Sequence, residues 1–197
     1  MRTAEITRRT KETEIKVSLV LEGSGQCESS TGVGFFDHML DQLARHSRMN
    51  LVVTAQGDLN IDAHHTVEDT GICIGQAIRD ALGDRSGLFR YGHAAVPMDE
   101  ALAEVAVDIG GRPFLHFEGE LPRGQVGQFD SDLVEEFLRA LAVNARITMH
   151  VVLRRGQNLH HCIEAIFKAL ARSLDEAVSR DNRLTGVPST KGVIENR

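Results

Sequence analysis

A short pattern, His-His-x-x-Glu, occurs twice in the chain and constrains its fold more than any other feature. The two copies are His64–Glu68 and His160–Glu164, which lie about half of the 197 residues apart. An apolar stripe at helical spacing follows each copy: Ile74, Ile78 and Leu82 in the first half, and Leu170, Leu174 and Val178 in the second. We infer an internal duplication, because chance self-similarity would not repeat a polar motif at the same place in an apolar pattern.

The similarity continues upstream of each motif. Met39–Ala44 matches Phe137–Ala142 in its apolar positions, at an offset of 98 residues. Arg48–Leu51 matches Arg146–Met149 at the same offset. Ile15–Leu19 resembles Val105–Ile109, and both segments show the alternation of a half-buried strand. The duplicated unit therefore includes strands as well as helices.

Each half is expected to contain strands, a helix, a further strand and a second helix that opens with the motif. We predict first helices over about 37–46 and 131–144, and the strands after them over about 50–55 and 147–153. This order indicates an α+β protein made of two similar two-layer units, each with a sheet on one side and helices on the other. Residues 1–92 are expected to form the first half-repeat and residues 93–197 the second, within one compact domain.

Charge and composition exclude several classes of function. The chain has 22 Lys and Arg residues against 28 Asp and Glu residues, a net charge of −6 at pH 7. This balance argues against a nucleic-acid partner, which needs a basic face, but it allows a small cationic cluster that holds one anion. No apolar run resembles a signal peptide or a membrane helix. Three cysteines without CxxC spacing indicate a reduced compartment, so we expect a cytoplasmic protein with no membrane partner.

The duplicated motif suits metal binding. On a helix, His64 and Glu68 share one face while His65 points about 100° away, so one motif can serve two ions. Nitrogen and oxygen ligands without thiolates favour manganese, iron or zinc. His38 and Glu136 occupy equivalent places near the start of the preceding helix in each half. The candidate ligands are thus His38, His64, His65, Glu68, Glu136, His160, His161 and Glu164, enough for two ions.

An adjacent pair of histidines has a simpler interpretation as a solvated helix start, with the glutamate interacting with the helix dipole. Two copies of the motif make that alternative weak. The other histidines follow no repeated pattern, and we expect them to be structural or surface residues: His46, His93, His116 and His150.

Longer motifs in a fixed order extend over nearly the whole chain. They are Arg9–Thr13, Gly32–Leu40, Asp62–Asp69, Gly111–Pro113, His160–Ala169 and Pro188–Gly192. In these segments the chain resembles imidazoleglycerol-phosphate dehydratase, an enzyme family of histidine biosynthesis. The resemblance implies a duplicated unit similar to the second domain of ribosomal protein S5. It also implies a cage of twenty-four subunits with two Mn²⁺ ions per active site at the subunit interfaces.

The resemblance further implies metal-ligand roles for seven of the eight candidates: His38, His64, His65, Glu68, His160, His161 and Glu164. Glu136 is a departure, because some family members have histidine there, although a glutamate is also a competent Mn²⁺ ligand. The implied reaction removes water from imidazole glycerol phosphate and gives imidazole acetol phosphate. Metal ions on both ring nitrogens would hold the ring as an imidazolate, which can expel the neighbouring hydroxyl through a diazafulvene-like intermediate.

The family also suggests catalytic and substrate-binding residues. Glu12 matches a substrate-contacting glutamate and is the candidate acid/base, although an exposed strand-edge charge is the simpler interpretation. The catalytic set is Glu12, His38, His65, His161 and Glu164. The substrate-binding set, mostly for the phosphate, is Glu12, Gln42, Arg90, Arg112, Lys168, Ser189 and Lys191, of which the last two lie on a tail expected to close over the site.

Two other functions stay open at this point. A dinuclear metallohydrolase would use the same ligands to make a metal-bound hydroxide, and it would release phosphate from a phosphoryl substrate. A non-catalytic metal-storage cage would bind metal without turnover. In that case the cationic residues would be incidental.

Overall fold

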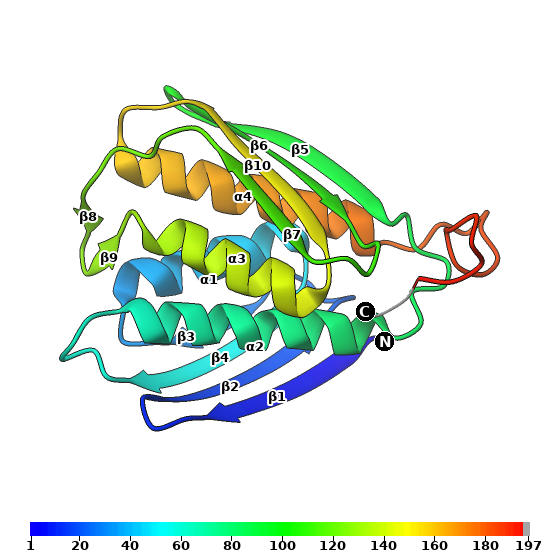
Figure 1. The fold of residues 1–197 in the computed structure, drawn as a ribbon, viewed down its shortest axis with the longest axis horizontal. Coiled ribbons are helices and arrows are strands. Elements are labelled where there is room, and N and C mark those ends of the chain that lie inside the picture. The colour runs from blue at the N-terminus through cyan, green and yellow to red at the C-terminus, as the bar shows by residue number, and fades with distance from the viewer. Residues whose placement is uncertain (195–197) are drawn as a thin grey trace.

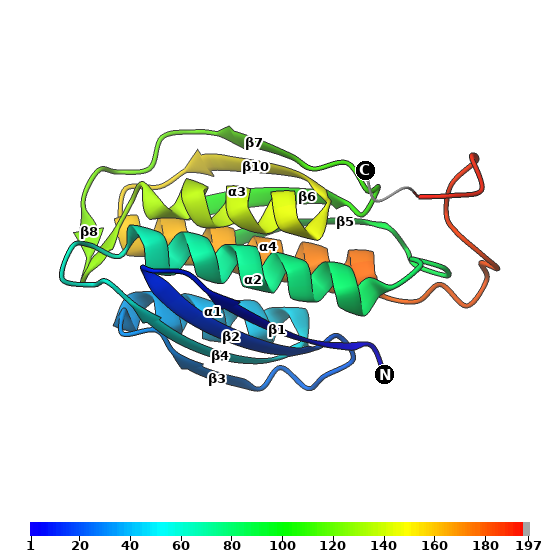
Figure 2. The same cartoon turned by 60° about the horizontal axis from the view of Figure 1, so that its bottom comes forward.

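The computed structural model describes residues 1–194, which form two four-stranded sheets with four helices between them (Figures 1 and 2). The first unit comprises β1 (Thr3–Arg9), β2 (Thr13–Val20), β3 (Cys27–Ser30), α1 (Gly34–Ser47), β4 (Asn50–Gly57) and α2 (His64–Leu82). The second comprises β5 (Tyr91–Met98), β6 (Ala101–Asp108), β7 (Phe114–Glu118), α3 (Leu133–Ala145), β10 (Thr148–Arg155) and α4 (Leu159–Val178). A small hairpin of β8 (Gln125–Val126) and β9 (Phe129–Asp130) precedes α3.

The two sheets have the same topology. Their strand orders are β1-β2-β4-β3 and β5-β6-β10-β7, and in each only the last pair of neighbours is parallel. The expected α+β fold with a duplicated unit is confirmed, and each predicted helix and strand overlaps an observed element. The division between residues 92 and 93 stays a prediction, with β5 beginning at Tyr91.

One detail of the expected repeat is wrong by two residues. The residues that cap the C-termini of α1 and α3 are Arg48 and Arg146, both in the left-handed conformation. Leu51 and Met149 each lie three residues after that cap and are both buried, so they are equivalent. Leu51 pairs with Leu19 in the first sheet, and Met149 pairs with Val107 in the second. Leu19 therefore corresponds to Val107, whereas the comparison of the two sequence halves matched it with Ile109. A shift of two leaves every side chain on the same face, so an alternating pattern cannot exclude it.

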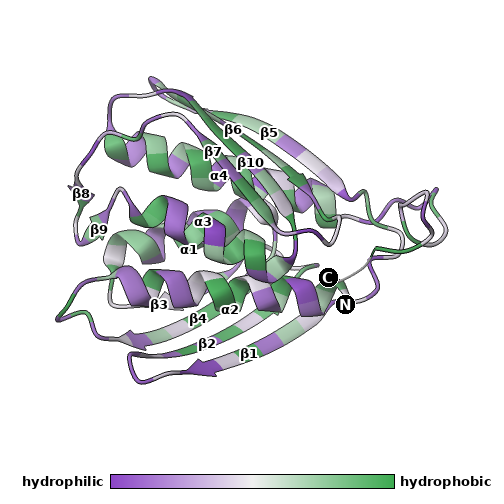
Figure 3. Cartoon of the chain, viewed as in Figure 1, coloured by the Kyte–Doolittle hydropathy of each residue, from purple (hydrophilic) through white to green (hydrophobic). Residues whose placement is uncertain are grey.

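Each sheet buries its inner face against the helical layer. The strands β2 and β6 alternate between buried and more exposed residues, and the banded strands in Figure 3 show the same alternation. In the middle layer α2 packs on α3, and α1 packs on α4. A Cβ at Gly71 or Gly75 would lie 2.9 or 2.7 Å from a carbonyl oxygen of α3, so glycine lets the two helix backbones come close.

All four helices begin at the same end of the molecule, on the left of Figure 1. The motif segments are the first turns of α2 and α4, where Asp62 accepts the His64 backbone N–H and Asn158 accepts that of His161. The C-terminal segment leaves α4 at the opposite end (Figure 1). Within residues 1–194, no helix has the length and apolarity needed to cross a membrane.

Candidate active site

α1 and α4 bring three candidate metal ligands together. His38 Nε2 lies 3.2 Å from Glu164 Oε2, and His160 Nε2 lies 3.0 Å from the same oxygen. The ring of Phe35 packs edge-on against His160, with the centroids 5.0 Å apart, and limits the movement of that imidazole. Among residues 1–194 these three side chains form the one group of histidine, cysteine and acidic ligands close enough together to bind a common ion.

The Glu164 carboxylate is the buried centre of this group. Its residue is 5% exposed, and its second oxygen, Oε1, accepts a charge-assisted contact of 2.6 Å from Lys168 Nζ. Burial raises the pKa of Glu164, but Lys168 and the two imidazoles outweigh burial and hold the pKa below its usual value. The carboxylate is therefore charged at neutral pH, as a metal ligand must be. The predicted phosphate ligand Lys168 here pairs with Glu164.

The equivalent group in the other half is less closely assembled. His64 Nε2 lies 4.0 Å from Glu68 Oε2, and both side chains are more than two-fifths exposed. Glu136 lies in the first turn of α3, the helix that packs on α2, as the repeat predicts. In the described part of the chain, however, the ligand atoms of these three residues do not come within range of one common ion.

The second histidine of each motif is oriented by an acidic residue that sequence reasoning missed. Asp58 Oδ2 lies 3.0 Å from His65 Nδ1, and Glu100 Oε2 lies 2.8 Å from His161 Nδ1. A carboxylate at Nδ1 fixes the tautomer of the ring and leaves the lone pair of Nε2 available to a ligand such as a metal ion. Asp58 follows β4, and Glu100 lies in the β5–β6 turn. Identifying these two residues from the sequence would have required the register of the strands, which places each turn beside its histidine.

These carboxylates change the proton affinity of the histidines. The hydrogen bond that His65 donates to Asp58 is the main cause that raises the pKa of His65, and the hydrogen bond that His161 donates to Glu100 does the same for His161. In return, His161 and the backbone amides of Gln157 and Asn158 lower the pKa of Glu100 to about 2.

A second carboxylate approaches the Nε2 side of each of these rings. Glu12 Oε2 lies 3.9 Å from His65 Nε2, and Asp99 Oδ2 lies 3.8 Å from His161 Nε2. Both residues come from hairpin turns, β1–β2 for Glu12 and β5–β6 for Asp99. The candidate acid/base Glu12 therefore lies beside a candidate metal ligand, and its side chain is 56% exposed.

Four of the predicted substrate-binding residues line a separate cavity of about 790 Å³ at the other end of the molecule, where the C-terminal segment lies in Figure 1. Arg90, Arg112, Ser189 and Lys191 all contribute to its wall. The Arg90 guanidinium donates two hydrogen bonds to Asp108, at 2.7 and 3.1 Å, and a third of 2.7 Å to the backbone oxygen of Pro188. It thereby ties the C-terminal segment to the start of β5.

The sequence and the fold are both similar to those of known proteins. A profile of the family described as imidazoleglycerol-phosphate dehydratase matches residues 31–174. The chain belongs to the imidazoleglycerol-phosphate dehydratase family. A dehydratase of this name from Geobacillus sp. is 56% identical, with 98% of this chain and all of the relative covered. Another, from Symbiobacterium thermophilum, is 58% identical over 98% of this chain and 93% of its own length.

Two solved structures of the dehydratase family share the fold. The enzyme from Staphylococcus aureus has a TM-score of 0.83 and 44% identity, over 91% of this chain and 99% of that chain. The enzyme from Pyrococcus furiosus, solved in complex with (S)-C348, also has a TM-score of 0.83, with 37% identity over 95% and 99% of the two chains. The resemblance seen in the motifs is thus confirmed, and the chain is an enzyme of the hydro-lyase class.

Gln42 and three of the four histidines outside the repeated pattern lie outside the two candidate ligand groups of this dehydratase family member. Gln42 is half-buried on α1, one turn after His38. Two of the other four histidines, His116 and His150, face each other on neighbouring strands, with ring centroids 5.2 Å apart and away from both ligand groups. His46 lies in the last turn of α1, where burial, followed by nearby cations, lowers its pKa.

Proposed function

We propose that the chain dehydrates imidazole glycerol phosphate to imidazole acetol phosphate in the cytoplasm, with two Mn²⁺ ions per active site. The single observation that carries this proposal is the convergence of His38, His160 and Glu164 on one point, in a chain of the dehydratase family. Nitrogen and oxygen donors without thiolate are a suitable set for Mn²⁺.

Two ligand groups would hold the ions. One is His38, His160 and Glu164, and the other is His64, Glu68 and Glu136; the outer histidines His65 and His161 complete the two sets. When bound, the ions supply Lewis acidity that stabilises the deprotonated imidazole ring of the substrate, and this favours departure of the neighbouring hydroxyl by a diazafulvene-type route.

The protein itself provides orientation and proton transfer. Asp58 and Glu100 keep His65 and His161 in the tautomer that presents Nε2. Glu12 is the candidate acid/base because its carboxylate lies beside His65 and accepts no hydrogen bond within the described residues. We propose that it removes the proton from the second side-chain carbon, which keeps its hydroxyl and becomes the ketone carbon. It then returns a proton to the carbon beside the ring during the final tautomerisation of the enol.

The geometry of one chain favours a site shared between subunits. The metal-ligand groups and the anion cavity lie at opposite ends of the fold, and α2 runs between them (Figure 1). A helix of 19 residues is about 28 Å long, whereas imidazole glycerol phosphate has only three carbons between ring and phosphate. One substrate cannot span that distance. We therefore propose a homo-oligomer of twenty-four subunits, in which another copy contributes the Arg90 cavity to these ligands.

Turnover of imidazole glycerol phosphate by the Mn²⁺-loaded protein tests the proposal. A ketone is expected to form while the phosphate stays attached, and chelation should stop the reaction until Mn²⁺ is restored. Release of inorganic phosphate would instead indicate a metallohydrolase, and metal binding without turnover would indicate storage. Exchanging His65 or His161 for alanine should abolish turnover and reduce the assembly size. Full activity and size in both variants after chelation would overturn the shared two-metal site.

A further inference from the structure

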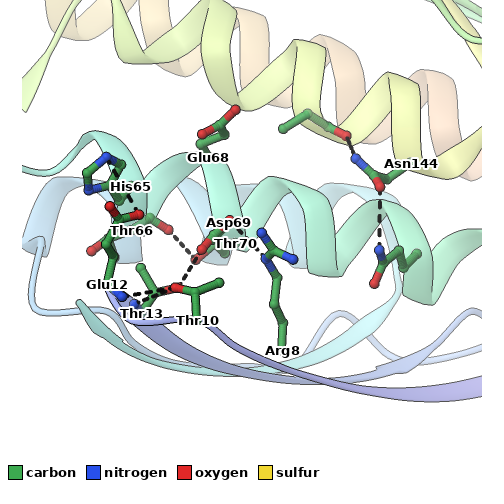
Figure 4. A network of polar contacts seen from close by, with 12 residues as sticks. Arg8, Thr10, Glu12, Thr13, His65, Thr66, Glu68, Asp69, Thr70 and Asn144 are labelled. Carbon is green, nitrogen blue, oxygen red and sulfur yellow. Dashed lines mark hydrogen bonds and ion pairs between the residues drawn. The ribbon is translucent and has the colours of Figure 1, made fainter. Parts of the chain in front are cut away.

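A buried carboxylate on α2 has no part in the function proposed so far. Asp69 directly follows the candidate ligand Glu68 and is 6% exposed. Its Oδ1 accepts a hydrogen bond of 2.9 Å from Arg8 Nε, and its Oδ2 accepts the hydroxyl proton of Thr13, which is 4% exposed. Figure 4 shows the two strand residues meeting Asp69 from below. Both oxygens of the Asp69 carboxylate therefore accept hydrogen bonds from side chains of the β1–β2 hairpin.

The hydrogen bonds continue from Thr13 to the turn that carries Glu12. Because Thr13 donates its proton to Asp69, its oxygen can accept the Thr10 hydroxyl, 3.3 Å away. The Thr10 oxygen in turn accepts the backbone N–H groups of Glu12 and Thr13, each at 3.0 Å. Glu12 is therefore joined to Asp69 by two hydroxyl groups (Figure 4).

The other half of the duplicated fold lacks this network. The β1–β2 and β5–β6 hairpins close in the same register. In the second hairpin, Met98 and Ala101 occupy the places of Thr10 and Thr13, and Val96 occupies the place of Arg8. Ala165 follows Glu164 as Asp69 follows Glu68. Alanine or larger apolar residues thus serve the same hairpin and helix in the second unit, so the fold does not require the polar set. Burying a carboxylate costs stability that apolar residues avoid, which points to a role in function.

The two turns also differ in what their glutamates do. Glu100, at the place equivalent to Glu12, binds His161 Nδ1 and accepts the backbone N–H groups of Gln157 and Asn158, at 3.1 and 2.7 Å. Its carboxylate anchors its own turn. In the first half Asp58 takes the corresponding ring position on His65. The Glu12 carboxylate has only a longer contact of 3.9 Å with His65 Nε2, and it accepts no backbone N–H that would anchor its turn within the described residues. The Glu12 turn therefore needs an anchor other than its own side chain.

We propose that Asp69 is a positioning residue for Glu12. Through Thr13 and Thr10 it holds the β1–β2 turn at a fixed distance from His65, which lies one helical turn before Asp69 on α2. Helix α2 thereby fixes the positions of both His65, which it carries, and Glu12, whose turn it holds through Asp69. This inference rests on the function proposed above for Glu12, since a fixed position matters only if that carboxylate takes part in turnover.

The test compares variants of the Mn²⁺-loaded protein in the dehydration assay. Thr13→Val and Asp69→Asn remove the hydroxyl link and the charge, and each is expected to lower kcat about 10- to 100-fold, with KM and metal content nearly unchanged. Thr13→Ser keeps the hydroxyl and should restore most of the rate. Thr7→Val, an exposed threonine on the same β1 strand, is the matched control and should keep full activity.

A double-mutant cycle with Glu12→Gln separates positioning from a structural role. If Asp69 acts through Glu12, Thr13→Val lowers the rate no further in the Glu12→Gln background. Equal losses in both backgrounds, or a Thr13→Ser variant as slow as Thr13→Val, would overturn the proposal. If Glu12→Gln itself keeps full kcat, the assigned role of Glu12 is wrong. A slow Glu12→Gln with a fully active Thr13→Val rejects only the positioning by Asp69. Thr13→Val also decides the matter if Asp69→Asn fails to fold.

Discussion

The unequal assembly of the two ligand groups predicts that Mn²⁺ binds in two phases. The group around Glu164 has its nitrogen and oxygen atoms 3.0 and 3.2 Å apart before any ion arrives. Metal–ligand bonds of about 2.1 Å at right or tetrahedral angles separate two ligand atoms by about 3.0–3.4 Å. This group therefore needs little rearrangement. His64 and Glu68, whose ligand atoms are 4.0 Å apart, must move and lose side-chain freedom on binding.

The expected difference in affinity follows from that ordering. Immobilising a flexible side chain costs about 0.5–1.5 kcal/mol, so fixing two of them costs about 1–3 kcal/mol. A tenfold change in affinity corresponds to about 1.4 kcal/mol, which makes the group around Glu164 about 5- to 150-fold tighter. Glu164→Gln keeps the shape of the side chain but removes its charge, and is expected to abolish the tighter phase. Glu68→Gln is the matched variant in the other group and should abolish the weaker phase.

Titration of the chelated protein with Mn²⁺, followed by calorimetry and by metal analysis after dialysis, measures both phases. Wild-type protein should bind two ions per chain, and each variant should keep one. Circular dichroism of the chelated proteins controls for folding. Two phases of equal affinity in the wild type, or a Glu164→Gln variant that keeps the tighter phase, would refute the reasoning from preorganisation.

Three further predictions concern packing, substrate affinity and pH. Gly75→Ala places a methyl group 2.7 Å from a backbone oxygen of α3 and should destabilise the fold by about 1–3 kcal/mol in thermal denaturation, whereas Gly34→Ala, with open space around it, should not. Arg90→Lys loses the paired contact with Asp108 and should raise the KM for the phosphate substrate about tenfold at unchanged metal content; an unchanged KM would place the phosphate elsewhere. Burial and neighbouring cations lower the pKa of His46, so the unfolded state binds the His46 proton more readily, and the contribution of this residue to the stability of metal-free protein should fall as pH drops below about 6.5. His46→Gln should flatten that fall in denaturant titrations, and an unaltered pH profile would contradict the assignment.

The candidate site shows where sequence reasoning ends. The repeated motif predicted His160 and Glu164 as ligands of one ion because both lie on one helix at a local spacing of four residues, and the fold places them 3.0 Å apart. Asp58 and Glu100 could not be found in this way. Each reaches its histidine from a loop or a hairpin turn, so the contact depends on the strand register. The sequence pattern does not fix that register, because a shift of two residues leaves the alternation of apolar and polar residues unchanged.

The sequence alone determined the duplication, the α+β class and the chemistry of the ligands, because each of these rests on local spacing and on residue type. The tertiary structure decided which of the two candidate ligand groups is closely assembled, and that the cavity around Arg90 lies at the far end of the fold. It also decided that Asp69 supports the turn of Glu12. The physical reason is that these features depend on how segments far apart in the chain pack together, and short-range periodicity carries no information about that packing.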